Sequence, residues 1–134
     1  MSQTMPKKTL SEKDLLDYAV RIGVQAKLDG IKKSQLENIL ASLELFEDPK
    51  HSLLVTAVYS NRQASRLKRG FRTADIISDI LNELYRNGYG REEARKILGL
   101  AKWTFESIEN KEVKVNVDIK KLTSEEFLKI LRGG

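Results

Sequence analysis

The chain of 134 residues contains no cysteine, two prolines and one histidine. Because cysteine is missing, these 134 residues cannot form disulfides, thiolate nucleophiles or cysteine-ligated zinc sites. The absence also favours a reducing compartment. The histidine, His51, follows Lys50 and lacks the partners of a Ser/His/Asp set, and neither metal-ligand spacing nor a Gly-rich phosphate loop is present. We therefore expect no catalytic residues, no metal and no cofactor.

Long apolar runs are also missing. No segment approaches the roughly 20 apolar residues that span a bilayer, and Met1 to Thr9 lack the apolar stretch of a signal peptide. The composition, 40% hydrophobic and 32% charged, is typical of a folded domain. We expect a cytoplasmic protein without a membrane contact, and the abundance of Ile, Leu, Lys and Glu suits an archaeal or thermophilic source.

Acidic residues are absent from one long internal segment, between Asp48 and Asp75. The whole chain has 24 Lys and Arg against 19 Asp and Glu, a net charge of +5. Without the cations of this segment, the balance is 18 against 19, or −1. The positive charge is therefore concentrated, as expected of a protein that holds a phosphate backbone. The cations of the segment are Lys50, Arg62, Arg66, Lys68, Arg69 and Arg72.

Apolar residues at helical spacing predict an all-α fold, a compact bundle of about five helices. Ser11 with Asp14, and Ser34 with Glu37, have the spacing of capping boxes that start the first two helices. We expect a flexible lead over 1–9, a helical bundle over 10–110 and an arm over 111–134. Within the bundle, the first two helices begin near Ser11 and Ser34, and three more cover 51–69, 73–87 and 91–108.

The arm over 111–134 is expected to be extended and to end in a short helix. Alternation of apolar and polar residues predicts a strand over 113–119. Thr123 and Glu126 have capping-box spacing, which predicts a helix over 123–131. A lone strand needs a partner for its edge groups, so we expect the arm to pair with another chain or to lie along the helices.

The basic segment predicts a cationic stripe on one helix. Tyr59, Arg62, Arg66 and Arg69 follow at spacings that place them on one face. Arginine makes bidentate contacts with phosphates, and Tyr59 can stack on a base or sugar. A surface helix normally carries both signs of charge, so the missing acidic residues favour nucleic-acid contact over a solvated face. Lys68 and Arg72 are expected to flank the stripe.

The next helix carries the opposite charge. Asp75, Asp79 and Glu83 are spaced by four and share a face. A metal or acid–base site would need a further ligand or a histidine at suitable spacing, and none is present. We interpret these carboxylates as a solvated face, or as an acidic surface that meets the basic face of an identical neighbour.

Residues 91–108 resemble a helix-turn-helix, which gives an alternative function, a small DNA-binding transcriptional regulator. Leu98-Gly99-Leu100 is the expected turn, and Lys102 to Glu106 would enter the major groove. A Trp on a helix with other apolar residues is more often core than base reader, so we expect Trp103 in the core.

Three stretches of the sequence resemble a known family. They are Tyr-Ala-Val-Arg-Ile-Gly at 18–23, Lys-Lys-Ser-Gln-Leu at 32–36, and Ala-Val-Tyr-Ser-Asn-Arg-Gln-Ala-Ser-Arg at 57–66. Over about residues 11–109, the chain resembles the small helical subunit of type III CRISPR effector complexes (the Csm/Cmr type).

The resemblance implies an all-helical, non-catalytic subunit of an antiviral ribonucleoprotein. Several copies would stack along the guide–target RNA duplex and touch the target strand, other effector subunits and one another. It implies that Lys33, together with Arg62, Arg66 and Arg69, contacts the RNA backbone. The expected binding falls steeply with salt and has little sequence preference.

Overall fold

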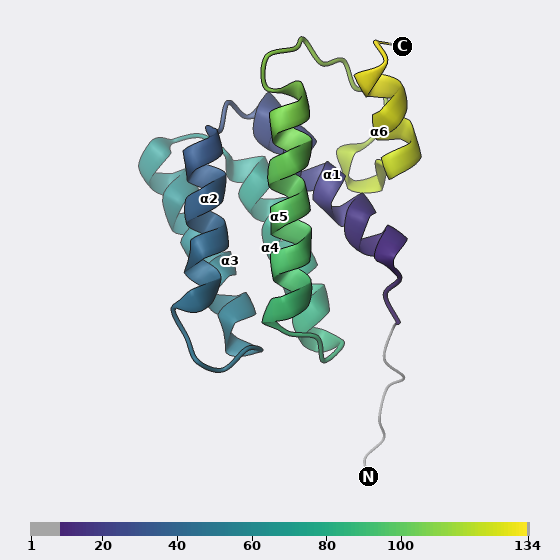
Figure 1. The fold of residues 1–134 in the computed structure, drawn as a ribbon. Helices are drawn as coiled ribbons and strands as arrows, with labels where there is room; N and C mark the ends of the chain where they lie inside the picture. The colour runs from purple at the N-terminus through teal and green to yellow at the C-terminus, as the bar shows by residue number, and fades with distance from the viewer. Residues whose placement is uncertain (1–8, 134) are drawn as a thin grey trace.

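The structure is a computed structural model that describes residues 9–133 (Figure 1). It is 73% helical and, within the described residues, has six α-helices and no strand, so the all-α prediction is confirmed. The predicted lead over 1–9 lies, except for Thr9, outside the described residues. The elements are α1 (Glu12–Leu28), α2 (Lys33–Ala41), η1 (Ser42–Glu44), α3 (His51–Leu67), α4 (Phe71–Arg86), α5 (Arg91–Ile108), η2 (Ile119–Lys121) and α6 (Ser124–Leu131).

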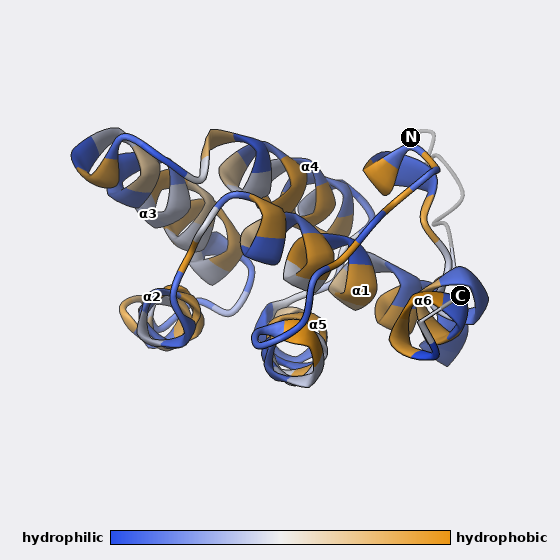
Figure 2. Ribbon diagram, turned by 90° about the horizontal axis from the view of Figure 1, so that it is seen from above, coloured by the Kyte–Doolittle hydropathy of each residue, from blue (hydrophilic) through white to orange (hydrophobic). Residues whose placement is uncertain are grey.

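The helices pack in two layers with α1 between them. α1 lies against α5 on one side and α4 on the other, while α3 packs along α4 and α2 along α5. Figure 2 shows α2 and α5 together on one side of the molecule and α3 and α4 on the other. Apolar side chains fill the space between the layers. The largest fully buried ones include Ile22, Leu43, Leu53, Ile77, Leu81, Leu84 and Ile97.

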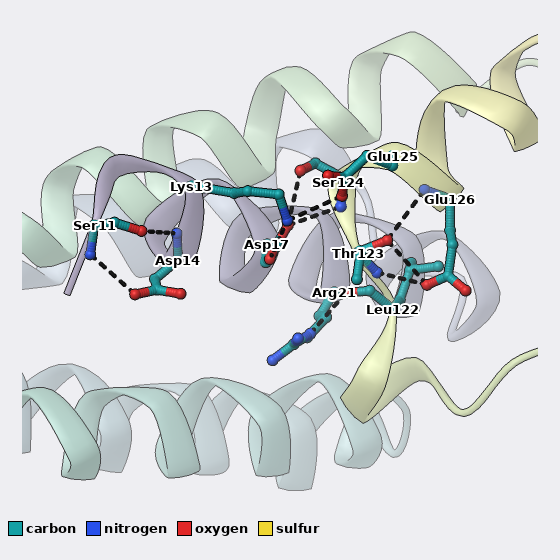
Figure 3. Close-up of polar contacts among 10 residues, drawn as sticks. All are labelled: Ser11, Lys13, Asp14, Asp17, Arg21, Leu122, Thr123, Ser124, Glu125 and Glu126. Carbon is teal, nitrogen blue, oxygen red and sulfur yellow. Dashed lines mark hydrogen bonds and ion pairs between the residues drawn. The ribbon is translucent and has the colours of Figure 1, made fainter. Parts of the chain in front are cut away.

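α1 begins where the sequence predicts. The Ser11 hydroxyl accepts a hydrogen bond from the Asp14 N–H at 3.1 Å, and the Asp14 carboxylate accepts one from the Ser11 N–H at 2.9 Å (Figure 3). Two otherwise unpaired backbone donors are thereby satisfied. The helix stops before Gly30, whose φ of 76° lies in the left-handed region that favours glycine.

α2 begins earlier than predicted, and the capping box expected at Ser34 does not form. The side-chain carbonyl of Gln35 instead accepts a hydrogen bond from the Lys32 N–H at 2.9 Å. Ile31, in the turn between α1 and α2, is buried, and α2 begins two residues after it, at Lys33. Ser34 therefore lies inside the first helical turn, where it cannot serve as the cap.

The turn between α3 and α4 is tighter than predicted. α3 ends at Leu67 because Lys68 adopts a left-handed conformation with a φ of 56°. Gly70 also has a positive φ of 85°, and a Cβ there would lie 2.5 Å from the Cδ1 of Ile31. α4 therefore begins at Phe71, earlier than the sequence indicates.

α1 and α5 approach each other closely at Gly23. A Cβ at this position would lie 2.6 Å from the Thr104 Cβ and 2.7 Å from the Ala101 carbonyl oxygen. The Thr104 hydroxyl donates to the Leu100 carbonyl at 2.9 Å, which leaves its methyl group against Gly23. Only glycine fits between these two helices at their present separation.

The predicted strand over 113–119 is wrong. Val113, Val115 and Ile119 pack against the cluster formed by α1, α5 and α6 rather than against a partner strand, whereas Val117 is exposed. α6 starts behind the predicted capping box of Thr123 and Glu126. The arm closes a second apolar cluster, whose buried members are Val20, Val24, Ile108, Leu122 and Phe127.

Polar contacts hold α6 against α1 (Figure 3). Asp17 accepts hydrogen bonds from the N–H and hydroxyl of Ser124 at 2.8 and 2.7 Å, and Lys13 lies 3.1 Å from Asp17 and 2.9 Å from Glu125. Burial alone would raise the pKa of Asp17, but the bonds from Ser124 and Lys13 outweigh it and lower that pKa. Arg21 adds a bond from its Nε to the Leu122 carbonyl at 2.8 Å.

Two glycines of the α1–α5 pair should respond oppositely to alanine. Gly23→Ala should lower the free energy of unfolding by about 1–3 kcal/mol, because the added methyl has no space. Gly99→Ala should raise it by about 0.5–1 kcal/mol, because a Cβ at Gly99 would meet nothing within 4 Å and alanine favours the helix. Chemical denaturation checks both, and equal effects of the two variants would contradict the close approach.

Asp17→Asn should loosen α6 and remove a pH dependence. Since the folded-state pKa of Asp17 is lowered from its ordinary 3.8, its contribution to stability is present above that value and is lost as the pH falls through the folded pKa. The amide resonance of Ser124 should shift in this range in an NMR pH titration from 6 to 2. In Asp17→Asn the shift should be absent; an unchanged titration would exclude Asp17 as its source.

Candidate nucleic-acid interface

The α3–α4 turn lies beside the α1–α2 loop at one end of the bundle (Figure 1). The Asp29 carboxylate ties them together, because it accepts hydrogen bonds from the N–H and hydroxyl of Thr73 at 2.9 and 2.7 Å. This junction collects exposed cations from two separate segments. We call them the basic end: Lys32, Arg62, Arg66, Lys68, Arg69 and Arg72.

Most cations of the basic end have no acidic partner. Within residues 9–133, the side chains of Arg62, Arg66 and Lys68 make no ion pair or hydrogen bond, and the same holds for Arg72. Several cations elsewhere are paired, as Arg95 is with Glu44 at 2.9 Å. Exposed charges of one sign without counter-charges attract an anionic partner.

The predicted stripe on α3 is present for three of its four members. Tyr59, Arg62 and Arg66 lie on the helix at spacings of three and four. The contact with α4 is made by another face of α3, on which the Asn61 amide donates to the Ser78 hydroxyl at 2.8 Å. The stripe therefore faces away from α4. The arginines are exposed, whereas Tyr59 is half-buried and packs against the main core. Tyr59 therefore offers only part of its ring to a ligand.

Arg69 and Lys50 do not lie on this stripe. Arg69 follows the end of α3 and turns back toward the α1–α2 loop, where its Nη1 lies 3.4 Å from the Gly30 carbonyl oxygen. Lys50 precedes the other end of α3, and its ammonium stacks 5.5 Å from the centre of the Tyr85 ring. The cations of the acid-free segment are thus split between the two ends of a 17-residue helix.

Lys33 is paired rather than free. Its Nζ lies 3.0 Å from the Glu106 carboxylate on α5, and this hydrogen bond raises the pKa of Lys33. The adjacent Lys32 is exposed and has no ion pair within the described chain. Sequence analysis did not single out Lys32, because only the helix start at Lys33 distinguishes the two neighbouring lysines.

Phe71 is a second residue that sequence analysis missed. It is the first residue of α4, between Arg69 and Arg72, and 56% of its surface is exposed. An aromatic residue at the start of an apolar helix is normally expected to be buried. No sequence pattern marks it as a surface residue, since its exposure follows from the early start of α4.

The acidic face predicted on α4 is divided. Asp75 and Asp79 are exposed, but Glu83 accepts a hydrogen bond from the Tyr18 hydroxyl at 2.7 Å. Burial, together with this bond, raises the pKa of Tyr18 well above its ordinary value. Among residues 9–133, no three His, Asp or Glu side chains are grouped so that they could hold a metal.

The predicted helix-turn-helix is wrong. α5 is one continuous helix from Arg91 to Ile108, and Gly99 lies in its middle. Lys102 is paired with Glu37 at 3.1 Å, and Thr104 is buried against α1, so neither is free to read a base. Packing of α5 on α1 and α2 outweighs the local preference of glycine for a turn.

Trp103 is not in the core, contrary to the prediction, and 70% of its surface is exposed. With Gly99, Leu100 and Leu15 it lines a groove of about 410 Å³ between α5 and α1. A second groove of about 460 Å³, whose lining includes Leu16, Val20, Phe127 and Leu128, lies between α1 and α6. This apolar surface, the Trp103 face, comprises Leu15, Leu16, Gly99, Leu100, Trp103 and Leu128.

Comparison with known proteins gives no relative. No family model, curated protein or solved structure matches the chain. None of the helices within residues 9–133 combines the length and apolar character needed to cross a bilayer.

Proposed function

We propose that the chain is a non-catalytic, RNA-backbone-binding small subunit of a type III CRISPR ribonucleoprotein, present in several copies along the guide–target RNA. The observation that carries the proposal is the basic end. Its unpaired guanidinium and ammonium groups on α3 and the α3–α4 turn form a surface suited to phosphates. The sequence resemblance over residues 11–109 supplies the class of complex.

A subunit of a larger assembly also needs a surface for protein contacts. The Trp103 face suits this role, because Trp is enriched among the residues that dominate binding energy at protein interfaces. The groove beside Trp103 lies against the start of α1, at Glu12 and Leu15, whereas the basic end lies beyond the other end of α1, so RNA and a protein partner can be held at the same time.

Removing charge from the basic end should weaken RNA binding. In the triple variant Arg62→Gln, Arg66→Gln, Arg72→Gln, the slope of log affinity against log salt should decrease by about 2–3, roughly one for each lost phosphate contact. Fluorescence anisotropy with a labelled RNA at several salt concentrations measures this slope. The loss should be similar for different RNA sequences.

A charge-matched control is available in the arm. Lys114, Lys121 and Lys129 are exposed and have no ion pair within residues 9–133. Changing all three to Gln removes the same net charge and should leave the salt slope unchanged. Equal losses for both triple variants would mean that overall charge, and not the basic end, attracts RNA.

Trp103→Ala should release the chain from its complex without a loss of RNA affinity. We expect a tagged wild-type chain, purified from its host, to give a large RNA-containing assembly in native mass spectrometry, and the Trp103→Ala chain to be depleted from it. Val58→Ala is the control, because Val58 is 69% exposed on a different helix. Retention of Trp103→Ala at the wild-type level would exclude the Trp103 face as an assembly surface.

A further inference from the structure

Phe71 is exposed although two other residues in the first turn of α4 are buried. Thr73 and Ala74 are covered by the rest of the molecule, whereas Phe71 keeps 56% of its surface in water and belongs to neither apolar cluster. Full burial of such a side chain is worth about 1.5–3 kcal/mol. The fold leaves much of that stabilisation unused, so packing alone gives no reason for an aromatic residue here.

Cations surround Phe71 in the chain. Lys68 and Arg69 form the turn before it and Arg72 follows it, and all three side chains are exposed. The N-terminal end of α4 is already met by the Asp29 carboxylate, so the positive charge available beside Phe71 is that of these three side chains. An exposed aromatic ring among positive charges matches the two parts of a nucleotide, the apolar base and the anionic phosphate.

A second exposed phenylalanine shows that exposure alone is not the distinguishing feature. Phe46 has 51% of its surface exposed but is followed by Glu47 and Asp48. Carboxylates repel a phosphate, and the Arg91 guanidinium beside Phe46 already donates to the Phe46 and Glu47 carbonyls and to the Ser52 hydroxyl. The two phenylalanines thus have similar exposure, but the cations next to Phe71 in the chain are free of ion pairs within residues 9–133, and Phe46 is followed by two carboxylates.

We propose that Phe71 stacks on one unpaired nucleobase of the bound RNA, with the adjoining phosphates held by Lys68, Arg69 and Arg72. The inference rests on the proposed RNA-binding function and specifies the form of RNA at this site. In an uninterrupted duplex, bases are stacked on one another, and their faces cannot reach a side chain. The site therefore takes a single-stranded segment or a nucleotide displaced from a duplex.

Asp75 sets the orientation of the nucleotide. It is exposed and lies one helical turn beyond Phe71, on the same face of α4. Its carboxylate repels phosphate and accepts hydrogen bonds from N–H groups, which bases carry on their edges. The base therefore points along α4 toward Asp75, while the phosphates stay at the turn.

The test compares two labelled RNA duplexes that share the same run of about 12 base pairs. One is blunt and uninterrupted, and the other carries one additional, bulged nucleotide near the centre of one strand. We expect the wild-type chain to bind the bulged RNA more tightly at equal salt. Phe71→Ala should abolish this preference, with a loss of about five- to a hundredfold in affinity for the bulged RNA, and should change the affinity for the blunt duplex by less than twofold.

Two further variants separate stacking from folding. Phe71→Tyr keeps an aromatic face and should retain the preference, whereas Phe71→Leu keeps an apolar side chain without that face and should lose it. The matched control is Phe46→Ala, which removes an equally exposed ring elsewhere and should behave as wild type. Thermal unfolding of each variant shows whether a loss of binding reflects a loss of structure; if Phe71→Ala is unstable, the Tyr and Leu pair decides.

The outcomes distinguish this inference from the proposed function. If Phe71→Ala keeps the bulge preference while the arginine triple variant loses binding, stacking is excluded and the backbone-binding function stands. If Phe71→Ala loses affinity equally for the blunt and the bulged RNA, stacking is also excluded. If the wild-type chain binds neither RNA at low salt, the proposed function and the inference fall together.

Discussion

The close approach of α1 and α5 at Gly23 sets the positions of the other helices. With no side chain between them, the Thr104 methyl and the Ala101 backbone of α5 rest directly on α1. α1 can then bury its remaining faces against α4 and against α6. The α1 helix is consequently the element that the two apolar clusters share, with Ile22 in one and Val20 in the other.

The basic end depends on the contacts that hold the α1–α2 loop against the α3–α4 turn, because α3 itself carries two of its six cations, Arg62 and Arg66. Asp29 binds Thr73 at the start of α4, where a carboxylate is favoured by the helix dipole. That bond brings the α1–α2 loop to the α3–α4 turn, so Lys32 joins cations that are distant in sequence. Both carboxylate oxygens of Asp29 are thereby occupied by internal donors, Oδ2 by Thr73 and Oδ1 by the side-chain amide of Gln25 at 2.8 Å.

Local signals predicted the fold well where one chemical interaction decides the outcome. The capping pairs at Ser11 and Thr123 start helices because each satisfies free backbone groups. Prediction failed where packing decides, as at Gly99, which lies inside a helix, and at Trp103, which lies outside the core. The α3 arginines followed from spacing, but Lys32 and Phe71 depended on where neighbouring helices start, and boundaries are the least certain part of a sequence pattern.

The docking of α6 on α1 joins residues that are far apart in the chain. Arg21 bonds to Leu122 across 101 positions, and Asp17 to Ser124 across 107. Because a chain is synthesised from its N-terminus, Val20 and Val24 exist well before Leu122 and Phe127, which complete their apolar cluster. Until those later residues have been made, Val20 and Val24 lack part of the cover that they have in the folded chain.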